Sequence, residues 1–228
     1  MGLRRSFPLT GEQNEVGRVA ASPDGHTVAF FRQNRPGISL IAVGTGQLEA
    51  ELPSLLFGWH GIAFSPDSQF VMGFGERRIE IWIPQQRRLA ARLNAAHLAD
   101  ISSVLFSPDM RFMASTSVDN TAKLWRAADW AEVATFRGHR ESVMSGAFSP
   151  DGKTFATGCS DGTVKLWDLG THRELASFKP LSLVWFVAFS PGGNSLACAP
   201  GWGPLYLLRE PSLEETDSQD QGRHLLSL

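Results

Sequence analysis

The sequence has few cysteines, and its cysteines and histidines lack the spacing of metal ligands. Both features limit the chemistry that the protein can perform. Cys159 and Cys198 are its two cysteines, and neither belongs to a Cys-x-x-Cys pair. They allow at most one disulfide, so we expect two small buried thiols. The six histidines likewise lack the spacing of a zinc site. The sequence therefore predicts no metal and no cofactor.

Lysine is also scarce, and no block of basic residues occurs. Four of the 21 basic residues are lysines, and the arginine pairs at 4–5, 77–78 and 87–88 are scattered. The net charge is −2 and the sequence pI is about 6.3. A dedicated nucleic-acid binder needs a basic stripe, so we expect no nucleic-acid partner.

Long apolar runs are absent as well. The longest, Leu183 to Phe189, has the length of one strand and falls far below the roughly 18 residues of a membrane helix. Residues 1–10 include two arginines and no apolar core of a secretory signal. We therefore expect no membrane partner and a cytoplasmic location.

One four-residue motif recurs at nearly constant spacing. It appears first as Ser22-Pro23-Asp24-Gly25 and returns with its serine at 65, 107, 149 and 190. The intervals are 43, 42, 42 and 41 residues, far more regular than chance gives so short a string. The chain is therefore a tandem array of five related units.

Each copy of the motif lies between two strand-like segments. Its proline presets φ, its aspartate caps the turn and its glycine adopts positive φ, so the motif predicts a tight turn. In the fourth unit, strands are predicted at 143–148, 153–159, 163–167 and 174–178. Four strands in about 40 residues are typical of a propeller blade, so the repeat predicts an all-β protein.

The fourth unit contains Gly138-His139, then Ser149-Pro150-Asp151-Gly152, then Ser160-Asp161 and Trp167-Asp168. This pattern resembles the WD-repeat β-propeller family, and the resemblance covers about residues 3 to 209. It implies a propeller of four-stranded antiparallel blades in one domain, 1–209, followed by a polar acidic tail, 210–228. We expect the blades at 14–53, 57–94, 99–137, 141–179 and 182–209.

In that family a His, a Ser or Thr, an Asp and a Trp form a buried hydrogen-bonded tetrad within a blade. The resemblance implies two such tetrads here: His97, Ser115, Asp119 and Trp125, and then His139, Thr157, Asp161 and Trp167. The chemistry is reasonable, because a buried carboxylate needs donors that imidazole and hydroxyl groups supply. Units one, two and five lack the set. We expect apolar packing alone to hold these three blades and to leave them less rigid.

The number of blades leaves several arrangements open. The units supply 19 strands, and residues 3–9 could add a twentieth as the closing outer strand of the fifth blade, as an N-terminal strand commonly does in the family. Rings of this family most often have seven blades. The chain is therefore an incomplete or open ring, a closed ring of five, or part of a ring that another chain completes. We favour the incomplete array, which leaves sheet faces in need of a partner and favours self-association.

The sequence offers weak signs of catalysis and stronger ones of binding. His139, Ser160 and Asp161 could be drawn as a nucleophilic set, but the tetrad and its adjoining turn account for the same residues. No catalytic residue is therefore predicted. In the family, contacts to partners lie in loops at one face of the ring. By position these are His60, Asp100, Ser102, Ser142, Met144, Leu183 and Trp185.

The leading hypothesis is a non-catalytic scaffold that binds a protein or peptide through these loops. Met144 and Trp185 are the candidate apolar anchor, because Met and aromatic residues are favoured at interface cores. A second hypothesis makes the chain a fragment or subunit of a larger propeller or fusion protein with only a structural role. A third makes it a propeller hydrolase or sugar-binding protein, because fold alone does not fix function.

Overall fold

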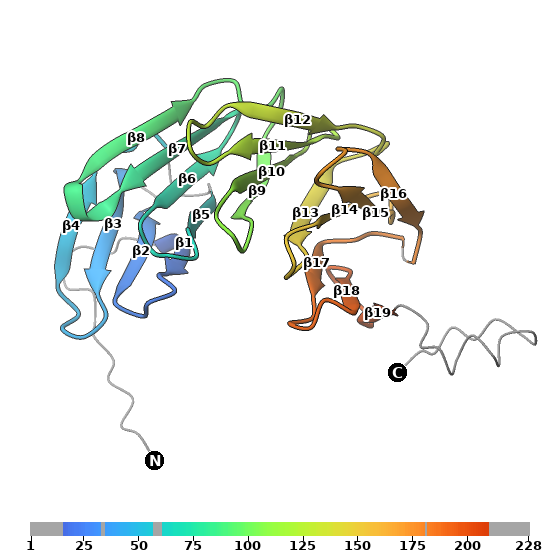
Figure 1. Cartoon of the computed structure of the whole chain (residues 1–228). Helices are drawn as coiled ribbons and strands as arrows, with labels where there is room; N and C mark the ends of the chain where they lie inside the picture. Colours follow the sequence, from blue (N-terminus) through green and yellow to red (C-terminus); the bar gives the residue numbers. More distant parts are fainter. Residues whose placement is uncertain (1–15, 33–34, 57–60, 181, 210–228) are drawn as a thin grey trace, which may run out of the picture. The chain divides into compact units, whose positions relative to one another are not determined.

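The computed structural model describes residues 16–32, 35–56, 61–180 and 182–209 (Figure 1). These residues form 19 strands and one short 3-10 helix, so the all-β prediction is confirmed. The possible closing strand at 3–9, the tail at 210–228 and the candidate contact His60 lie outside the described residues. The chain divides into two compact units between Val104 and Leu105.

The strands form five antiparallel sheets in chain order, which we call blades one to five. Blade one contains β1 (Val16–Ala21), β2 (Thr27–Arg32), β3 (Arg35–Ala42) and β4 (Leu48–Leu52). Blade two contains β5 (Gly61–Phe64), β6 (Val71–Gly75), β7 (Arg78–Ile83) and β8 (Arg88–Leu93), with the helix η1 (Pro84–Gln86) before β8. Blade three contains β9 (Ile101–Phe106), β10 (Phe112–Ser117), β11 (Ala122–Arg126) and β12 (Glu132–Phe136).

The last two blades differ in their number of strands. Blade four contains β13 (Val143–Phe148), β14 (Thr154–Cys159), β15 (Val164–Asp168) and β16 (Glu174–Phe178). Blade five contains β17 (Phe186–Phe189), β18 (Ser195–Ala199) and β19 (Tyr206–Arg209). Each strand pairs with the next along the chain, so blade five has three strands within the described residues where the others have four.

The recurring turn joins the first two strands of every blade. In blade four, the Ser149 hydroxyl donates to Asp151 Oδ1 at 2.6 Å, and the Lys153 N–H donates to the same oxygen at 3.0 Å. These bonds lower the pKa of Asp151 because they favour its charged form. Gly152 has φ 69°, as the turn requires. The turn is therefore fixed by its own polar groups.

The fifth copy of the turn, Ser190-Pro191-Gly192-Gly193, keeps this geometry without its aspartate. The Ser190 hydroxyl donates instead to Asn194 Oδ1 at 3.0 Å, and Gly193 has φ 77°. The Gly193 N–H donates to the Ser190 carbonyl at 2.9 Å, as in the other copies. An amide oxygen two positions later thus replaces the carboxylate.

The core lies between neighbouring sheets. Phe136, at the end of β12, is 2% exposed and packs against Phe155 and Trp167 of blade four, with ring centroids 5.8 and 5.1 Å away. Between blades four and five the buried residues are smaller, and include Ala156, Val187 and Leu196. In the first unit, Phe31 of blade one packs in a cluster with Trp82 of blade two. Alternation along each strand supplies both faces with apolar side chains.

Candidate functional site

Blade four brings four predicted residues into one buried network. His139 precedes β13, Thr157 lies in β14, Asp161 lies in the β14–β15 turn and Trp167 lies in β15. The Trp167 indole N–H donates to Thr157 Oγ1 at 2.8 Å, and His139 Nε2 lies 2.7 Å from the same oxygen. Trp167 is 3% exposed and Thr157 is 0% exposed. These bonds tie three segments of the blade together.

A fifth residue, Thr163, links the histidine to the aspartate. The Thr163 hydroxyl donates to Asp161 Oδ1 at 2.6 Å, so its oxygen accepts from His139 Nδ1 at 3.1 Å. Nε2 of a neutral His139 then accepts from the Thr157 hydroxyl. The donations run in one direction, from Trp167 through Thr157, His139 and Thr163 to Asp161. Sequence reasoning missed Thr163, although its place two residues after Asp161 is typical of a hydroxyl that caps a turn carboxylate.

The network requires a neutral histidine and an ionised aspartate. Burial lowers the pKa of His139 to about 4, and the nearby charge of Lys165 acts in the same direction. Burial alone would raise the pKa of Asp161, but hydrogen bonds from the Thr163 hydroxyl and N–H outweigh it and lower that pKa to about 2. Both states are therefore stable across the neutral range of pH.

Blade three carries a similar arrangement. The Trp125 indole N–H donates to Ser115 Oγ at 2.9 Å, and the Thr121 hydroxyl donates to Asp119 Oδ1 at 2.5 Å. Thr121 follows Asp119 by two residues, as Thr163 follows Asp161. His97, the remaining predicted member, is 1% exposed.

Blade two differs from the prediction that apolar packing alone would hold it. Glu80 of β7 is 0% exposed and accepts from Trp82 Nε1 at 3.4 Å and from Arg92 Nε at 3.0 Å. It also accepts from the Leu55 N–H at 3.4 Å. The prediction was wrong because it expected the acid only near the turn position that Asp119 and Asp161 occupy in blades three and four, where unit two has Glu76. The signal was a glutamate two residues before the tryptophan, flanked by isoleucines.

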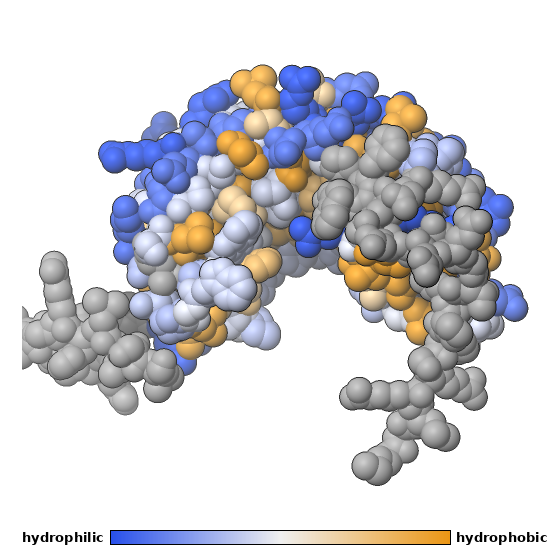
Figure 2. Space-filling model, turned by 180° about the vertical axis from the view of Figure 1, so that it is seen from behind, coloured by the Kyte–Doolittle hydropathy of each residue, from blue (hydrophilic) through white to orange (hydrophobic). Residues whose placement is uncertain are grey.

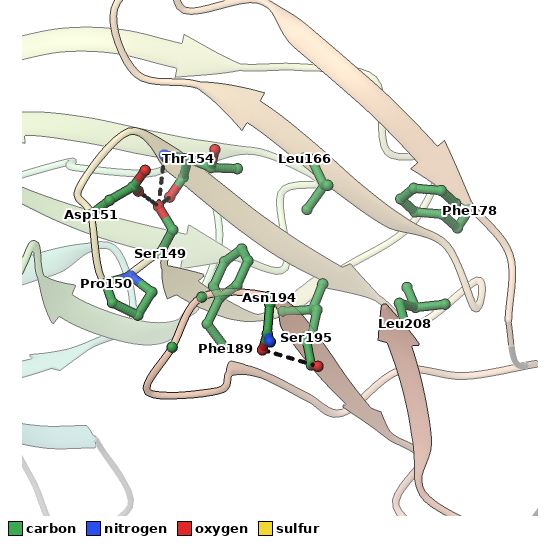
Figure 3. A pocket seen from close by; sticks show the side chains of 13 residues that line it. Ser149, Pro150, Asp151, Thr154, Leu166, Phe178, Phe189, Asn194, Ser195 and Leu208 are labelled. Carbon is green, nitrogen blue, oxygen red and sulfur yellow. Dashed lines mark hydrogen bonds between the residues drawn. The ribbon is translucent and has the colours of Figure 1, made fainter. Parts of the chain in front are cut away.

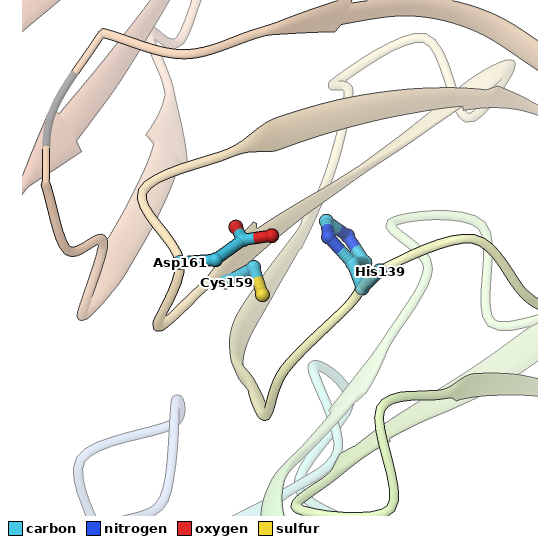
Figure 4. Close-up of side chains that lie close together, drawn as sticks. All are labelled: His139, Cys159 and Asp161. Atoms are coloured by element: carbon cyan, nitrogen blue, oxygen red, sulfur yellow. The ribbon is translucent and has the colours of Figure 1, made fainter.

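Three groups of blade four could ligate a metal. Ligand atoms of His139, Cys159 and Asp161 lie within 4.8 Å of one another (Figure 4). Each already has a protein partner: both imidazole nitrogens bond to threonines, Asp161 accepts from Thr163, and Cys159 Sγ donates to the Glu141 carbonyl at 3.3 Å. The hydrogen bonds account for these groups as a structural network.

The residues of the possible nucleophilic set and the two cysteines also make structural contacts. The Ser160 hydroxyl donates to Glu141 Oε2 at 3.1 Å, and no bond joins it to His139, whose nitrogens bond to Thr157 and Thr163. Both cysteines are free and buried, as predicted. Burial raises the pKa of Cys159 and raises that of Cys198 to about 11. Neither thiol is poised as a nucleophile.

The candidate partner contacts of the second unit lie at one end of blades four and five, opposite the Ser-Pro turns. We call this the upper loop end: residues 140–144, 159–163 and 182–185. The Ser160 N–H donates to the Ser142 carbonyl at 2.9 Å, and the Val184 N–H donates to the Cys159 carbonyl at 3.0 Å. These bonds bring the segments of Ser142, Met144, Leu183 and Trp185 together. Asp100, exposed, and Ser102, half-buried, belong to the first unit.

Trp185 is the most prominent of these candidates. Its side chain is 39% exposed and lies so close to Gly201 that a Cβ there would fall 2.5 Å from the ring. The Trp185 N–H donates to the Ala199 carbonyl at 2.9 Å. Two further exposed aromatics, Phe186 at 67% and Trp202 at 92%, were missed as candidates. The sequence shows Trp202 between two glycines, a setting that gives a ring little to pack against.

These features define a class of protein. Antiparallel sheets that repeat every 41 to 43 residues, four of them with four strands, and a Trp–hydroxyl–His network in blade four resemble the blades of WD-repeat propellers.

Comparison with known proteins agrees with this class. Residues 90–126 and 130–168 match the family described as "WD domain, G-beta repeat", so the chain contains WD repeats at these two positions. It is similar to the Saccharomyces cerevisiae proteins "Periodic tryptophan protein 2", at 35% identity over 94 residues, and "Putative guanine nucleotide-exchange factor SED4", at 31% over 101 residues. The matches cover 36% and 41% of this chain. The chain spans about a tenth of the length of each relative.

Within the residues that the structure describes, helices long and apolar enough to cross a membrane do not occur.

Proposed function

We propose that the chain is a non-catalytic scaffold that holds a protein or peptide at the upper loop end of blades four and five. The WD repeats support a general role in protein interaction. The observation that favours this particular place is Trp185, a large ring left 39% exposed and seated on the backbone of Gly201. Rigid aromatic side chains lose little entropy on binding and are favoured as anchors.

The surroundings of the ring suit a peptide or protein surface. Met144 is half-buried at the start of β13, and Trp202 is exposed beside Gly201. Ser160 and Glu141 supply polar groups at the rim. Figure 2 shows that apolar and polar areas both occur on one side of the described surface. An apolar centre with a polar rim is the usual anatomy of an interface.

The absence of catalysis and a cytoplasmic location belong to the same proposal. The residues that could have formed a catalytic set are engaged in the network of blade four or in the Ser160–Glu141 bond. No charge pattern in the sequence favours nucleic acid. Asp100 and Ser102 of the first unit are proposed as contacts separately from the upper loop end.

The test compares proteins captured by the wild-type chain with those captured by a Met144→Ala, Trp185→Ala double variant. We expect partners, identified by mass spectrometry and rebound in purified form, to lose at least about tenfold in affinity. Trp130→Ala is the matched control, because Trp130 lies in the β11–β12 turn, at the other end of its sheet. Equal binding by the double variant and the wild type would contradict the proposal.

A further inference from the structure

Blade five leaves one strand edge open within the described residues. Its sheet ends on β19, whereas the other four sheets each continue to a fourth strand. Two leucines are exposed at this edge: Leu205, directly before β19, is 58% exposed and Leu207, within β19, is 47% exposed. Native proteins usually protect an edge with charges, proline or a bulge. Here Pro204 and Arg209 lie at the two ends of the stretch Leu205-Tyr206-Leu207-Leu208, which itself has none of these. An unprotected apolar edge favours pairing with another strand.

A groove lies beside the same edge, between blades four and five (Figure 3). It has a volume of about 660 Å³ and is lined by apolar side chains, among them Phe178 and Leu208, and by polar groups of the two Ser-Pro turns. Phe178 is 40% exposed, although its counterpart in blade three, Phe136, is 2% exposed. The cause is local. Leu196 and Leu208 occupy the places that Phe155 and Trp167 fill in blade four, so less side-chain volume reaches Phe178.

The four complete blades show what a fourth strand must carry. Opposite the middle of the third strand each places a small residue: Ala50, Ala91, Ala134 and Ala176. Two residues later each places a large apolar one: Leu52, Leu93, Phe136 and Phe178. The fourth strands therefore share a small-x-large pattern in a fixed register.

The pairing of β18 with β19 shows which residues of blade five correspond to those of blade four. Leu207 pairs with Ala197 as Leu166 pairs with Ala156, so Leu207 corresponds to Leu166 and Leu205 to Val164. A strand that completes this sheet would place its small residue opposite Leu207 and its large residue opposite Leu205. Because side chains alternate, the residue between them would lie on the side of the sheet that faces the groove.

We propose that β19 and this groove form a docking site for an extended strand of a partner protein with the pattern small-x-large apolar. The strand adds antiparallel to the outer edge of β19, and main-chain hydrogen bonds and two apolar contacts hold it there. Residues 1–15 and 210–228 contain no alanine, so neither stretch carries the alanine that all four fourth strands have. This site is separate from the upper loop end and does not depend on it.

The probe is a fluorescein-labelled peptide with the sequence of residues 172–179, His-Arg-Glu-Leu-Ala-Ser-Phe-Lys, taken from around β16. Titration with the full chain should give a saturable rise in anisotropy, and hydrogen exchange should slow in β19. Leu207→Arg and Leu205→Arg should each weaken binding at least about tenfold. Leu175→Arg, at a leucine 57% exposed on β16, is the matched control and should leave binding unchanged.

Several results would overturn the proposal. These are no saturable binding, equal binding by the Leu207→Arg variant, and equal binding of a peptide with Asp in place of its Phe. Slow exchange of the outward β19 amides without peptide would show that a segment of the same chain or a second copy covers the edge, which also contradicts a partner strand. Melting temperatures of the Leu205→Arg and Leu207→Arg variants show whether these chains still fold. The peptide with Asp in place of Phe tests binding with the wild-type chain, whose folding is unchanged. The Met144→Ala, Trp185→Ala variant should still bind the peptide, so this test and that of the loop end fail independently.

Discussion

The fourth and fifth blades share a turn and a strand order but differ in residues of their second and third strands. In blade four, Thr157 and Trp167 belong to a directed chain of hydrogen bonds that ends on Asp161. In blade five the same places hold Cys198 and Leu208, which offer no such bonds. Blade four therefore contains a buried side-chain network that these two positions of blade five cannot form.

This difference shows how one repeat can serve two purposes. The Trp167 ring fills the space against Phe136 and satisfies its N–H inside the blade. With Leu208 in that place, Phe178 stays 40% exposed and a groove remains. The smaller residues that replace the network in blade five thus leave a surface that can accept another chain.

The largest expected effect comes from giving blade four the residue of blade five. Trp167→Leu should lower the free energy of unfolding by about 3 kcal/mol, because it removes buried ring volume and the donor to Thr157. Urea denaturation measures the change. Trp202→Leu, at a tryptophan 92% exposed, should change stability by less than about 0.5 kcal/mol. Similar losses in the two variants would contradict the comparison.

Acid should weaken blade four through His139. Its pKa is about 4 in the folded protein against an ordinary value of 6.5, so below pH 6.5 the unfolded chain binds a proton that the folded chain excludes. Stability should fall between pH 6.5 and 4, by up to about 3 kcal/mol. Asp161, with a pKa of about 2, adds a loss below pH 3.8. Denaturation across this range should show that the free energy of unfolding depends less steeply on pH in His139→Gln. An unchanged dependence would mean that a group other than His139 causes the loss.

Removing one hydroxyl should have a smaller effect. Thr157→Val keeps the shape but leaves the Trp167 N–H and His139 Nε2 without their shared partner, at a cost of about 2 kcal/mol. Thr157→Ser keeps the hydroxyl, as Ser115 does in blade three, and should cost under about 1 kcal/mol. Calorimetry of the two variants distinguishes the lost bonds from the lost methyl group. A greater loss for Ser would show that packing dominates.

The smallest effect is expected at the surface of the same blade. Lys165 Nζ lies 2.8 Å from Glu174 Oε2, and Lys123 makes the equivalent pair with Glu132 in blade three. Glu174→Gln should cost about 0.5 kcal/mol, because partly exposed ion pairs contribute little. The difference from wild type should vanish in 1 M salt. A larger or salt-independent loss would mean that Glu174 contributes by packing.

The sequence predicts much of the fold because the regular spacing of the motif places the strands of every unit. The Ser-Pro-Asp turns and the strand order follow from the spacing of one motif. The resemblance to the WD-repeat family implies four of the five residues of the blade-four network. Thr163 and Glu80 were missed because neither falls at a motif position: Thr163 lies between two groups of the network, and Glu80 is a strand residue buried by its neighbours. The groove escaped prediction because it depends on side-chain volume across two blades, compared at Phe136 and Phe178.

The candidate contacts were harder to predict than the network. Counting along the repeat places Ser142, Met144, Leu183 and Trp185 at the upper loop end, because each unit begins its inner strand at the same distance from the turn. It does not show which rings stay exposed. Trp202 and Phe186 are exposed because the loop around Gly201 and the three-stranded sheet leave them uncovered within the described residues.

Native-state hydrogen exchange of the full chain, followed amide by amide, tests the central claim most directly. If the network makes blade four the rigid blade, hydrogen-bonded amides of β14 and β15 should exchange at least about tenfold more slowly than those of β18 and β19. The gap should close in Thr157→Val. Equal protection of the two blades in the wild-type chain would contradict the claim that the network makes blade four the more rigid blade.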